Sequence, residues 1–308
     1  MAPRLAYLGL GNIGRAMSKN LVEKGNLDSP LVLYNRTTSR AEALAETIGR
    51  DRAKVASTIA EAVKDADIIF TCVGTDEVDK ETYATALEGD VKGKIFVDCA
   101  TIHPSTSDEL AKVVAEKGAE YIGCPVFGAP AMADAGQLVC VPAGPAGAVT
   151  KLKPYLKGVV GREIIDMSDR EPSKAAALKL VGNSFVLLMV EMIAEGLTLA
   201  EKTGVGSDVA QNFLETMFGA ASPMGAYAKR MTSGDYYKRD EPLLAIDLGL
   251  KDTNHILSLA KDSGTRMIGM ETVKHHLEAV KEHAGSKGDM AGMYGAVRKE
   301  SGLKYENE

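Results

Sequence analysis

The sequence of 308 residues contains only four cysteines, has no surplus of positive charge and has no long uninterrupted apolar run. The cysteines show no Cys-x-x-Cys spacing, which argues against a redox pair or a cysteine-based metal site. A formal net charge of −6 without a basic stripe argues against a nucleic-acid or anionic-membrane partner. Because no apolar run reaches the roughly 18 residues that a spanning helix needs, we expect no membrane segment.

The residues that most often bind metals are also sparse and poorly arranged for that task. Each of the four cysteines lies in or at the end of an expected strand, so buried thiols are expected. These positions are Cys72, Cys99, Cys124 and Cys140. His275 and His276 are adjacent, and neighbouring side chains on a helix diverge. We therefore expect no metal site.

The sequence also lacks internal repeats, low-complexity tracts and room for a signal peptide before its first apolar segment. These features lead us to expect a cytoplasmic protein. Its length is ample for two domains, each with a sizeable core.

The most informative feature that is present is the glycine motif Gly9-Leu10-Gly11-Asn12-Ile13-Gly14. It follows the apolar run Leu5 to Leu8 and precedes a helical pattern, as in a dinucleotide-binding turn. In that context Gly9 makes the tight turn, Gly11 admits a pyrophosphate and Gly14 lets the helix pack closely on the strand. The N-terminus of the following helix favours an anion. The motif predicts an N-terminal Rossmann domain.

The end of the second expected strand, Leu31 to Tyr34, indicates which dinucleotide is bound. An NAD enzyme carries an acidic residue there, whereas this chain has Asn35, Arg36 and Thr37. Asn35 removes the carboxylate that would repel a 2′-phosphate, and Arg36 can pair with that phosphate. These residues favour NADP(H), the alternative being that Arg36 is only a solvated residue at a strand end.

Strand and helix patterns alternate along the N-terminal half and predict a doubly wound parallel sheet. The strands are expected at residues 5–8, 31–34, 53–56, 68–73, 94–99 and 120–123. Residues 137–141 and 163–165 are expected to add strands, with the sheet ending near Asp166.

The pattern then changes to long helices, beginning with an apolar helix expected over Ser173 to Thr203. Further helices are expected at residues 209–218, 242–261, 271–282 and 290–300. We predict an α/β fold with an NADP-binding domain over residues 1–168 and an all-helical substrate and dimerisation domain over residues 169–308. Because the long helix is apolar on most faces, we expect it to join the domains and to pack in a homodimer or homotetramer.

Four patterns occur in order along nearly the whole chain. They are Gly9 to Gly14 followed by Met17, Asn20, Leu21 and Gly25; Asp98 to Pro104; Cys124 to Ala129 followed by Ala133, Gly136 and Leu138; and Lys179 to Asn183. Together they resemble the signatures of the β-hydroxyacid dehydrogenase, or 3-hydroxyisobutyrate dehydrogenase, family, and only the C-terminal end matches poorly. The resemblance implies a nicotinamide-dependent oxidoreductase acting on a small molecule.

By this resemblance Lys179 is the catalytic acid and base, and Asn183 orients the substrate. The two residues are four apart in an expected helix, so they share a face. An ammonium held against the carbonyl oxygen can protonate the alkoxide that hydride delivery leaves. Lys251, in a pattern similar to the family's Lys-Asp pair, is expected near the cofactor. Its alternative is a simple helical pair with Asp247.

Further cofactor contacts are expected where strands end at the carboxyl edge of the sheet. These residues are Val73, Gly74, Thr75 and Thr101.

Two departures from the family pattern bear on the substrate. Ala100 and Phe127 stand where the family usually has serines that hydrogen-bond a carboxylate. The backbone N–H groups of Phe127, Gly128 and Ala129 could still cradle an anion. We expect a small 3-hydroxyacid or semialdehyde, with a bulkier aldehyde, ketone or imine as the second choice because an aromatic wall suits an apolar arm.

Two other functions compete with this interpretation. Imine-reducing relatives generally lack the lysine that this chain keeps, and a noncatalytic NADP-binding scaffold would be expected to lose the Lys-x-x-x-Asn pair. The helical part is too short for 6-phosphogluconate dehydrogenase itself.

Overall fold

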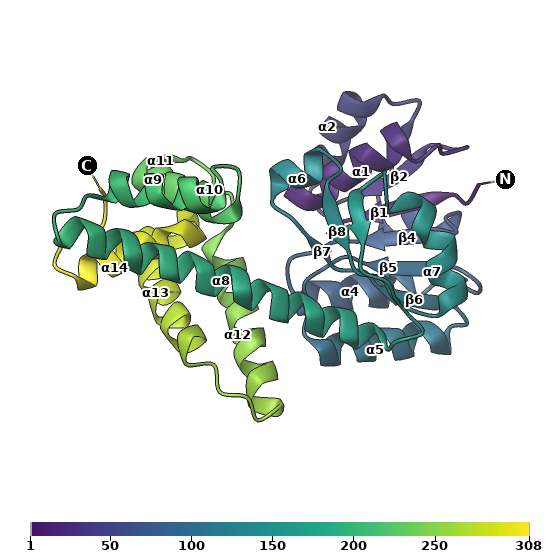
Figure 1. Cartoon of the computed structure of the whole chain (residues 1–308). Helices are drawn as coiled ribbons and strands as arrows, with labels where there is room; N and C mark the ends of the chain where they lie inside the picture. Colours follow the sequence, from purple (N-terminus) through teal and green to yellow (C-terminus); the bar gives the residue numbers. More distant parts are fainter. Residues whose placement is uncertain (1, 308) are drawn as a thin grey trace. The chain divides into compact units, whose positions relative to one another are not determined.

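The computed structural model describes residues 2–307, which divide into two compact units between Lys179 and Leu180. The first unit holds the strands, coloured purple to teal in Figure 1, and the second is built from the green and yellow helices. The predicted boundary at residue 168 lies just before the long helix, whereas the division between the units lies inside it.

The main sheet of the first unit has eight strands within the described residues. In spatial order they are β11 (Met167–Ser168), β9 (Ala143–Gly144), β6 (Glu120–Gly123), β5 (Ile95–Asp98), β4 (Ile68–Thr71), β1 (Leu5–Leu8), β2 (Leu31–Tyr34) and β3 (Ala53–Val55). The six neighbouring strands β3, β2, β1, β4, β5 and β6 pair in parallel, and β9 runs antiparallel to β6. The chain order reverses between β1 and β4, where doubly wound sheets open a crevice for a ligand. The predicted α/β fold is confirmed.

Helices and short loops cover the two faces of this sheet. They are α1 (Asn12–Lys24), α2 (Thr38–Ile48), α3 (Ile59–Lys64), α4 (Asp76–Ala86), α5 (Pro104–Glu116), α6 (Pro130–Asp134), α7 (Ala146–Leu152) and the 3-10 turn η1 (Lys153–Tyr155). Strand β1 shows why both faces are apolar, because Tyr7 joins one buried cluster while its neighbours Ala6 and Leu8 join another. A strand buried on both faces reads as a continuous apolar run.

The strands expected at residues 137–141 and 163–165 exist, but the expectation that they extend the main sheet is wrong. They form a separate three-stranded sheet in the order β10 (Gly161–Ile164), β8 (Leu138–Cys140) and β7 (Val126–Phe127). The main sheet ends instead with β9 and β11. Strand β9 ends at Gly144, which has a φ of +148° and lies close to the Tyr121 carbonyl oxygen. A residue with a Cβ would not fit at this position.

The second unit consists, within its described residues, of helices and the loops between them, with one isolated antiparallel bridge between Ala245 and Asp289. Its elements are α8 (Pro172–Lys202, which begins in the first unit), α9 (Ser207–Phe218), α10 (Pro223–Thr232), α11 (Asp235–Lys238), α12 (Ile246–Asp262), α13 (Ile268–Ala284), α14 (Met293–Glu300) and the 3-10 turns η2 (Gly285–Lys287) and η3 (Met290–Gly292). Sequence reasoning missed α10 and α11. The signal for α10 was present, since Ser222 caps its first turn and Pro223 occupies a position that tolerates proline.

Helix α8 is long and apolar enough to cross a membrane by length and composition alone. The sequence had led us to expect no such segment, because no uninterrupted apolar run is long enough. The mean hydropathy of α8 over the best window is 1.7, and 39% of that window is buried. One such helix is weak evidence of a span, because the core helix of a soluble protein passes the same test. The helix also buries the polar residues Glu191 and Thr198 against protein.

Candidate active site

The glycine turn between β1 and α1 has the shape that a dinucleotide requires. A Cβ on Gly9, whose φ is +94°, would lie 2.4 Å from the Cys72 carbonyl oxygen, and one on Gly14 would lie 2.1 Å from the Gly9 carbonyl oxygen. A Cβ on Gly11 would meet nothing within 4 Å. Gly9 and Gly14 therefore serve the turn and the packing of the helix, while Gly11 leaves open space at the N-terminus of α1, where a pyrophosphate fits.

Asn35 ties the loop after β2 to this turn, a role that the sequence did not reveal. Its Oδ1 accepts a hydrogen bond of 2.9 Å from the Leu10 N–H, and its Nδ2 donates one of 3.0 Å to the Thr37 carbonyl oxygen. Arg36 and Thr37 lie exposed between the end of β2 and the start of α2. The structure thus brings Leu10 and Asn35 into contact, and Arg36 is the next residue in the sequence.

The other predicted cofactor residues of the first unit follow the carboxyl ends of neighbouring strands. Val73, Gly74 and Thr75 follow β4, and Thr101 follows β5. The Thr75 hydroxyl caps α4 by accepting a hydrogen bond of 3.3 Å from the Val78 N–H. These residues share the carboxyl edge of the sheet with the glycine turn.

A buried carboxyl group that sequence reasoning passed over, Asp98, supports the loop after β5. It accepts hydrogen bonds of 2.9 Å from the Ala100 N–H and 2.7 Å from the Tyr121 hydroxyl. Burial raises the pKa of the Asp98 carboxyl above its usual value. Asp98, the first residue of the second sequence pattern, therefore shapes the backbone of the loop that carries Thr101.

Lys179 lies half-buried on α8 against the end of β7. Its Nζ donates a hydrogen bond of 2.8 Å to the Val126 carbonyl oxygen and lies 4.6 Å from the centre of the Phe127 ring. The fold thus brings together the lysine of the fourth sequence pattern and the aromatic residue of the third, which are far apart in the chain. The ammonium meets a carbonyl oxygen and an aromatic face, both of which attract a cation.

The segment after β7 is held in a restricted shape. Gly128 has a φ of +146°, and a Cβ there would lie 2.6 Å from the Leu138 side chain. Ala129 caps the short helix α6, whose end is fixed by Asn20 through hydrogen bonds to the carbonyl oxygens of Ala133 and Asp134. Phe127, Gly128 and Ala129 therefore lie in sequence on one constrained turn.

In the second unit Asn183 belongs to a polar cluster with two residues of α12. Its Nδ2 donates a hydrogen bond of 2.8 Å to Asp252, and the Lys251 ammonium lies 3.2 Å from the other oxygen of that carboxylate. Asp247, the alternative partner considered for Lys251, pairs with Lys281 at 2.8 Å instead. Asp252, which the sequence gave no separate role, orients both predicted site residues of this unit.

The four cysteines are free thiols, and all but Cys72 are buried. Cys72 as a residue is only half-buried, yet burial around its sulfur raises the pKa of this thiol to about 12. The Cys72 thiol is therefore protonated at neutral pH and a poor nucleophile.

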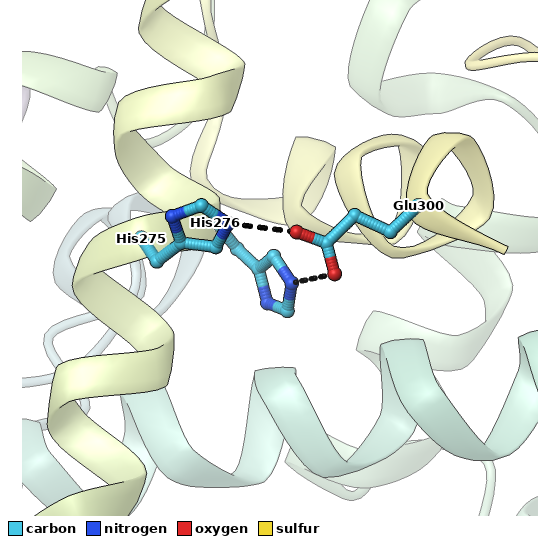
Figure 2. Close-up of side chains that lie close together, drawn as sticks. All are labelled: His275, His276 and Glu300. Atoms are coloured by element: carbon cyan, nitrogen blue, oxygen red, sulfur yellow. Dashed lines mark hydrogen bonds and ion pairs between the residues drawn. The ribbon is translucent and has the colours of Figure 1, made fainter.

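The argument that His275 and His276 diverge is wrong in this structure. As Figure 2 shows, both rings of α13 turn toward Glu300 at the end of α14. His275 Nε2 lies 2.7 Å from Glu300 Oε1, and His276 Nε2 lies 3.2 Å from Oε2. On the other side, His276 Nδ1 lies 2.7 Å from the buried carboxylate of Glu191, which raises the pKa of the ring to about 9. Adjacent side chains leave a helix in different directions, but the two rings still reach the same carboxylate of Glu300.

A glycine turn that opens a helix at the switch point of a parallel sheet defines the class of dinucleotide-binding oxidoreductases. Two family profiles match the chain, and both are described as NAD-binding. The profile described as the NAD binding domain of 6-phosphogluconate dehydrogenase matches residues 4–178, and that described as the NAD-binding domain of NADP-dependent 3-hydroxyisobutyrate dehydrogenase matches residues 173–297. The chain belongs to the β-hydroxyacid dehydrogenase family and is an NAD(P)-dependent dehydrogenase acting on CH–OH groups.

Similar individual proteins cover nearly the whole chain. A protein named NADH-dependent oxidoreductase ucdB, from Aspergillus ustus, is 34% identical over 95% of this chain and 98% of its own length. The crystal structure of a 3-hydroxyisobutyrate dehydrogenase from Salmonella typhimurium matches with a TM-score of 0.82 and 19% identity, covering 96% of this chain and 99% of its own. An imine reductase from Pseudomonas sp. matches with a TM-score of 0.62 and 18% identity, covering 96% and 99%. The two structures establish the likeness of fold.

Proposed function

We propose that the protein is an NADP(H)-dependent oxidoreductase that interconverts a small 3-hydroxyacid and its semialdehyde or ketone. The observation that carries this proposal is the position of Lys179, whose ammonium lies 2.8 Å from the Val126 carbonyl oxygen, at the start of the segment that resembles the family's substrate loop. A solvated surface lysine would not be held against a strand end in this way. Asn183, four residues further along α8, is the proposed second substrate contact.

In the proposed reaction the residues of the chain move one proton and hold the substrate. Bound NADP(H) supplies a hydride to the carbonyl carbon, or accepts it in the reverse direction. Lys179 donates a proton from Nζ to the oxygen that becomes the hydroxyl, and takes it back in the oxidation. Asn183, whose amide is oriented by Asp252, hydrogen-bonds the substrate. The turn at Phe127, Gly128 and Ala129 binds the acid end through backbone N–H groups.

The preference for NADP(H) is supported by the residues after β2. Asn35 is a neutral amide where a carboxylate would exclude a 2′-phosphate, and the exposed Arg36 provides a partner for that phosphate. The first N–H groups of α2, which follow Thr37 in sequence, are further donors for an anion. The Aspergillus relative is named for NADH, so the cofactor is a property to be measured for this chain itself.

Replacing Lys179 tests the proposed proton transfer. Lys179→Ala is expected to lower turnover by roughly 10² to 10⁴ without weakening NADPH binding, because Lys179 is held by β7, whereas the phosphates are expected at the glycine turn. Lys179→Met, which keeps the length of the side chain but has no proton to give, is the matched control and is expected to fail equally. NADPH affinity is measured by fluorescence titration and turnover by NADPH absorbance. Near-normal turnover of Lys179→Ala on its best substrate would contradict the mechanism.

A second candidate, reduction of an imine or a bulkier carbonyl compound, is favoured by one observation. Phe127 places an aromatic ring 4.6 Å from the Lys179 ammonium, where the family usually has a small hydroxyl side chain. Such a wall suits an apolar substrate arm. A panel of semialdehydes, keto acids, plain aldehydes and cyclic imines with NADPH separates the candidates. Tight NADPH binding without turnover on any of them would instead favour a noncatalytic scaffold.

We further propose a cytoplasmic enzyme with a small-molecule substrate and no nucleic-acid or membrane partner. The net charge of −6 supports the absence of an anionic partner. The buried Glu191 on α8 supports a packed core role for the apolar helix. Cell fractionation with an antibody to the native protein would test the location.

A further inference from the structure

A group of side chains of metal-binding type lies in the second unit and shares no residue with the proposed active site. It consists of His275 and His276 on α13 and Glu300 on α14 (Figure 2). Their ligand atoms, one nitrogen from each ring and a carboxylate oxygen, lie within 4.8 Å of one another. Glu300 lies beyond residue 297, where the match to the family profile ends. The profile therefore covers the two histidines of the group but not its carboxylate.

Glu191 contacts the ring nitrogen of His276 that faces away from Glu300, as carboxylates around metal sites contact ligand histidines. Its carboxylate on α8 lies 2.7 Å from His276 Nδ1, and the side chains of Glu191 and His276 are only 6% and 5% exposed. Ligand histidines almost always donate their second ring N–H to a carboxylate or carbonyl group, which fixes the ring and increases its basicity. This contact assigns Nδ1–H to Glu191 and aims Nε2 of His276 at Glu300.

We propose that His275, His276 and Glu300 bind a divalent first-row transition metal ion such as Zn²⁺. Two imidazole nitrogens and one carboxylate oxygen are a ligand set that suits Zn²⁺ and leaves a fourth position for water. The ion would replace the Nε2 protons that now join the two rings to Glu300. The Nε2 proton of His276, whose Nδ1–H stays on Glu191, passes to solvent, and the Nε2 proton of His275 moves to its Nδ1 by way of solvent.

The geometry requires only a small contraction of the group. Ligand atoms around a tetrahedral Zn²⁺ lie roughly 3.3 Å apart, given metal–ligand bonds of about 2.0 to 2.1 Å. The side chains of His275 and Glu300 are 66% and 52% exposed, so they can rotate inward and the ion can enter from solvent. His276 is buried and already fixed by Glu191. A bound ion would thus join α13 to α14 through two mobile ligands and one rigid ligand.

The competing role for the same residues is an ion-pair network without metal, and titration with Zn²⁺ separates the two. Calorimetry on the full chain without an added polyhistidine segment is expected to give one Zn²⁺ per chain. Zn²⁺ is also expected to raise the unfolding temperature, because an ion that binds only the folded state stabilises it. Co²⁺ at the same position is expected to give a visible absorption spectrum.

Two variants make the test specific. His275→Gln removes an exposed ligand and is expected to abolish the Zn²⁺ stoichiometry, the thermal shift and the Co²⁺ spectrum. The matched control is His283→Gln on the same helix, because His283 forms an exposed pair with Glu306 at 3.1 Å but has no second histidine beside it. This variant is expected to behave like the unmodified protein.

A third variant, Glu191→Gln, tests the supporting contact and is expected to weaken Zn²⁺ binding about 10- to 100-fold. Circular dichroism establishes that each variant is folded. Absence of Zn²⁺ binding by the unmodified protein at a concentration of about 100 µM, or equal binding by His275→Gln and His283→Gln, would overturn the proposal and leave an ion-pair network only.

Discussion

The contacts of Lys179 differ in strength, and the stronger one decides where the ammonium lies. A hydrogen bond from a charged donor contributes about 1.5 to 3 kcal/mol, whereas a partly exposed cation–π contact contributes about 0.5 to 1 kcal/mol. The Val126 carbonyl oxygen therefore holds Nζ, and the Phe127 ring closes one side of it. A substrate oxygen must compete with this carbonyl group for the same proton.

At the same scale, Arg36 is expected to discriminate between the two nicotinamide cofactors. Arg36→Ala should weaken NADPH binding by roughly 1.5 to 3 kcal/mol, the contribution of one charge-assisted contact. NADH, which has no 2′-phosphate, serves as the internal control and should bind the variant and the unmodified protein alike. Fluorescence titration with both cofactors checks this. Equal affinity of the unmodified protein for NADPH and NADH would contradict the assignment.

At the scale of the element, the glycine turn offers two substitutions with opposite consequences. Gly14→Ala places a Cβ 2.1 Å from the backbone oxygen of Gly9, which cannot move aside as a side chain could. It should lower the free energy of unfolding by about 1 to 3 kcal/mol, more than the gain of up to about 1 kcal/mol in helix propensity. Urea unfolding measures the change.

Gly11→Ala is the matched variant in the same turn. Its Cβ meets nothing within 4 Å, so the free energy of unfolding should not fall. NADPH binding should nevertheless weaken, because the new methyl group occupies the space where the pyrophosphate approaches the backbone. Loss of stability with unchanged NADPH affinity in Gly11→Ala would show that this assignment of the two glycines is wrong.

The elements that could be predicted from the sequence are those whose signal lies within one segment. The apolar run Leu5 to Leu8, the glycine motif and the long helix each carry their own pattern, and all three are present. The pairing of β7, β8 and β10 could not be predicted, because strands of two to four residues take their partners from tertiary contacts.

The same distinction applies to the candidate sites. Lys179 and Asn183 could be nominated by their spacing and resemblance, but the Val126 carbonyl oxygen has no sequence signal because every residue carries one. The convergence of His275 and His276 was missed because it depends on Glu300, which comes from another helix.

At the scale of the whole molecule, an apolar stripe on α8 leads us to propose a homodimer. Val181, Phe185, Met192 and Leu199 follow one another at intervals of four and seven residues, so they lie on one face of the helix. Phe185 is 69% exposed and Leu199 is 65% exposed. Large aromatic and aliphatic side chains exposed in a continuous row are typical of protein–protein interfaces.

Charge on this stripe should separate the subunits. The double variant Phe185→Glu/Leu199→Glu is expected to be monomeric at micromolar concentration, since two carboxylates per subunit cannot be buried without partners. Val113→Glu is the control, because Val113 is an exposed apolar residue of α5 and does not belong to the stripe. Light scattering after size-exclusion chromatography gives the mass. A monomeric unmodified protein would contradict the proposal.

The hydrogen bonds of Asn35 also constrain any redesign of this loop for tighter binding of NADH. An aspartate at position 35 would keep the bond from the Leu10 N–H but would set a negative charge against the Thr37 carbonyl oxygen, which now accepts from Nδ2. The loop would have to relax before the new carboxylate could accept the ribose 2′-hydroxyl. If NADP(H) is the cofactor, as we propose, changing position 35 alone should therefore weaken NADPH binding before it improves NADH binding. A library that varies positions 35 to 37 together is the better starting point.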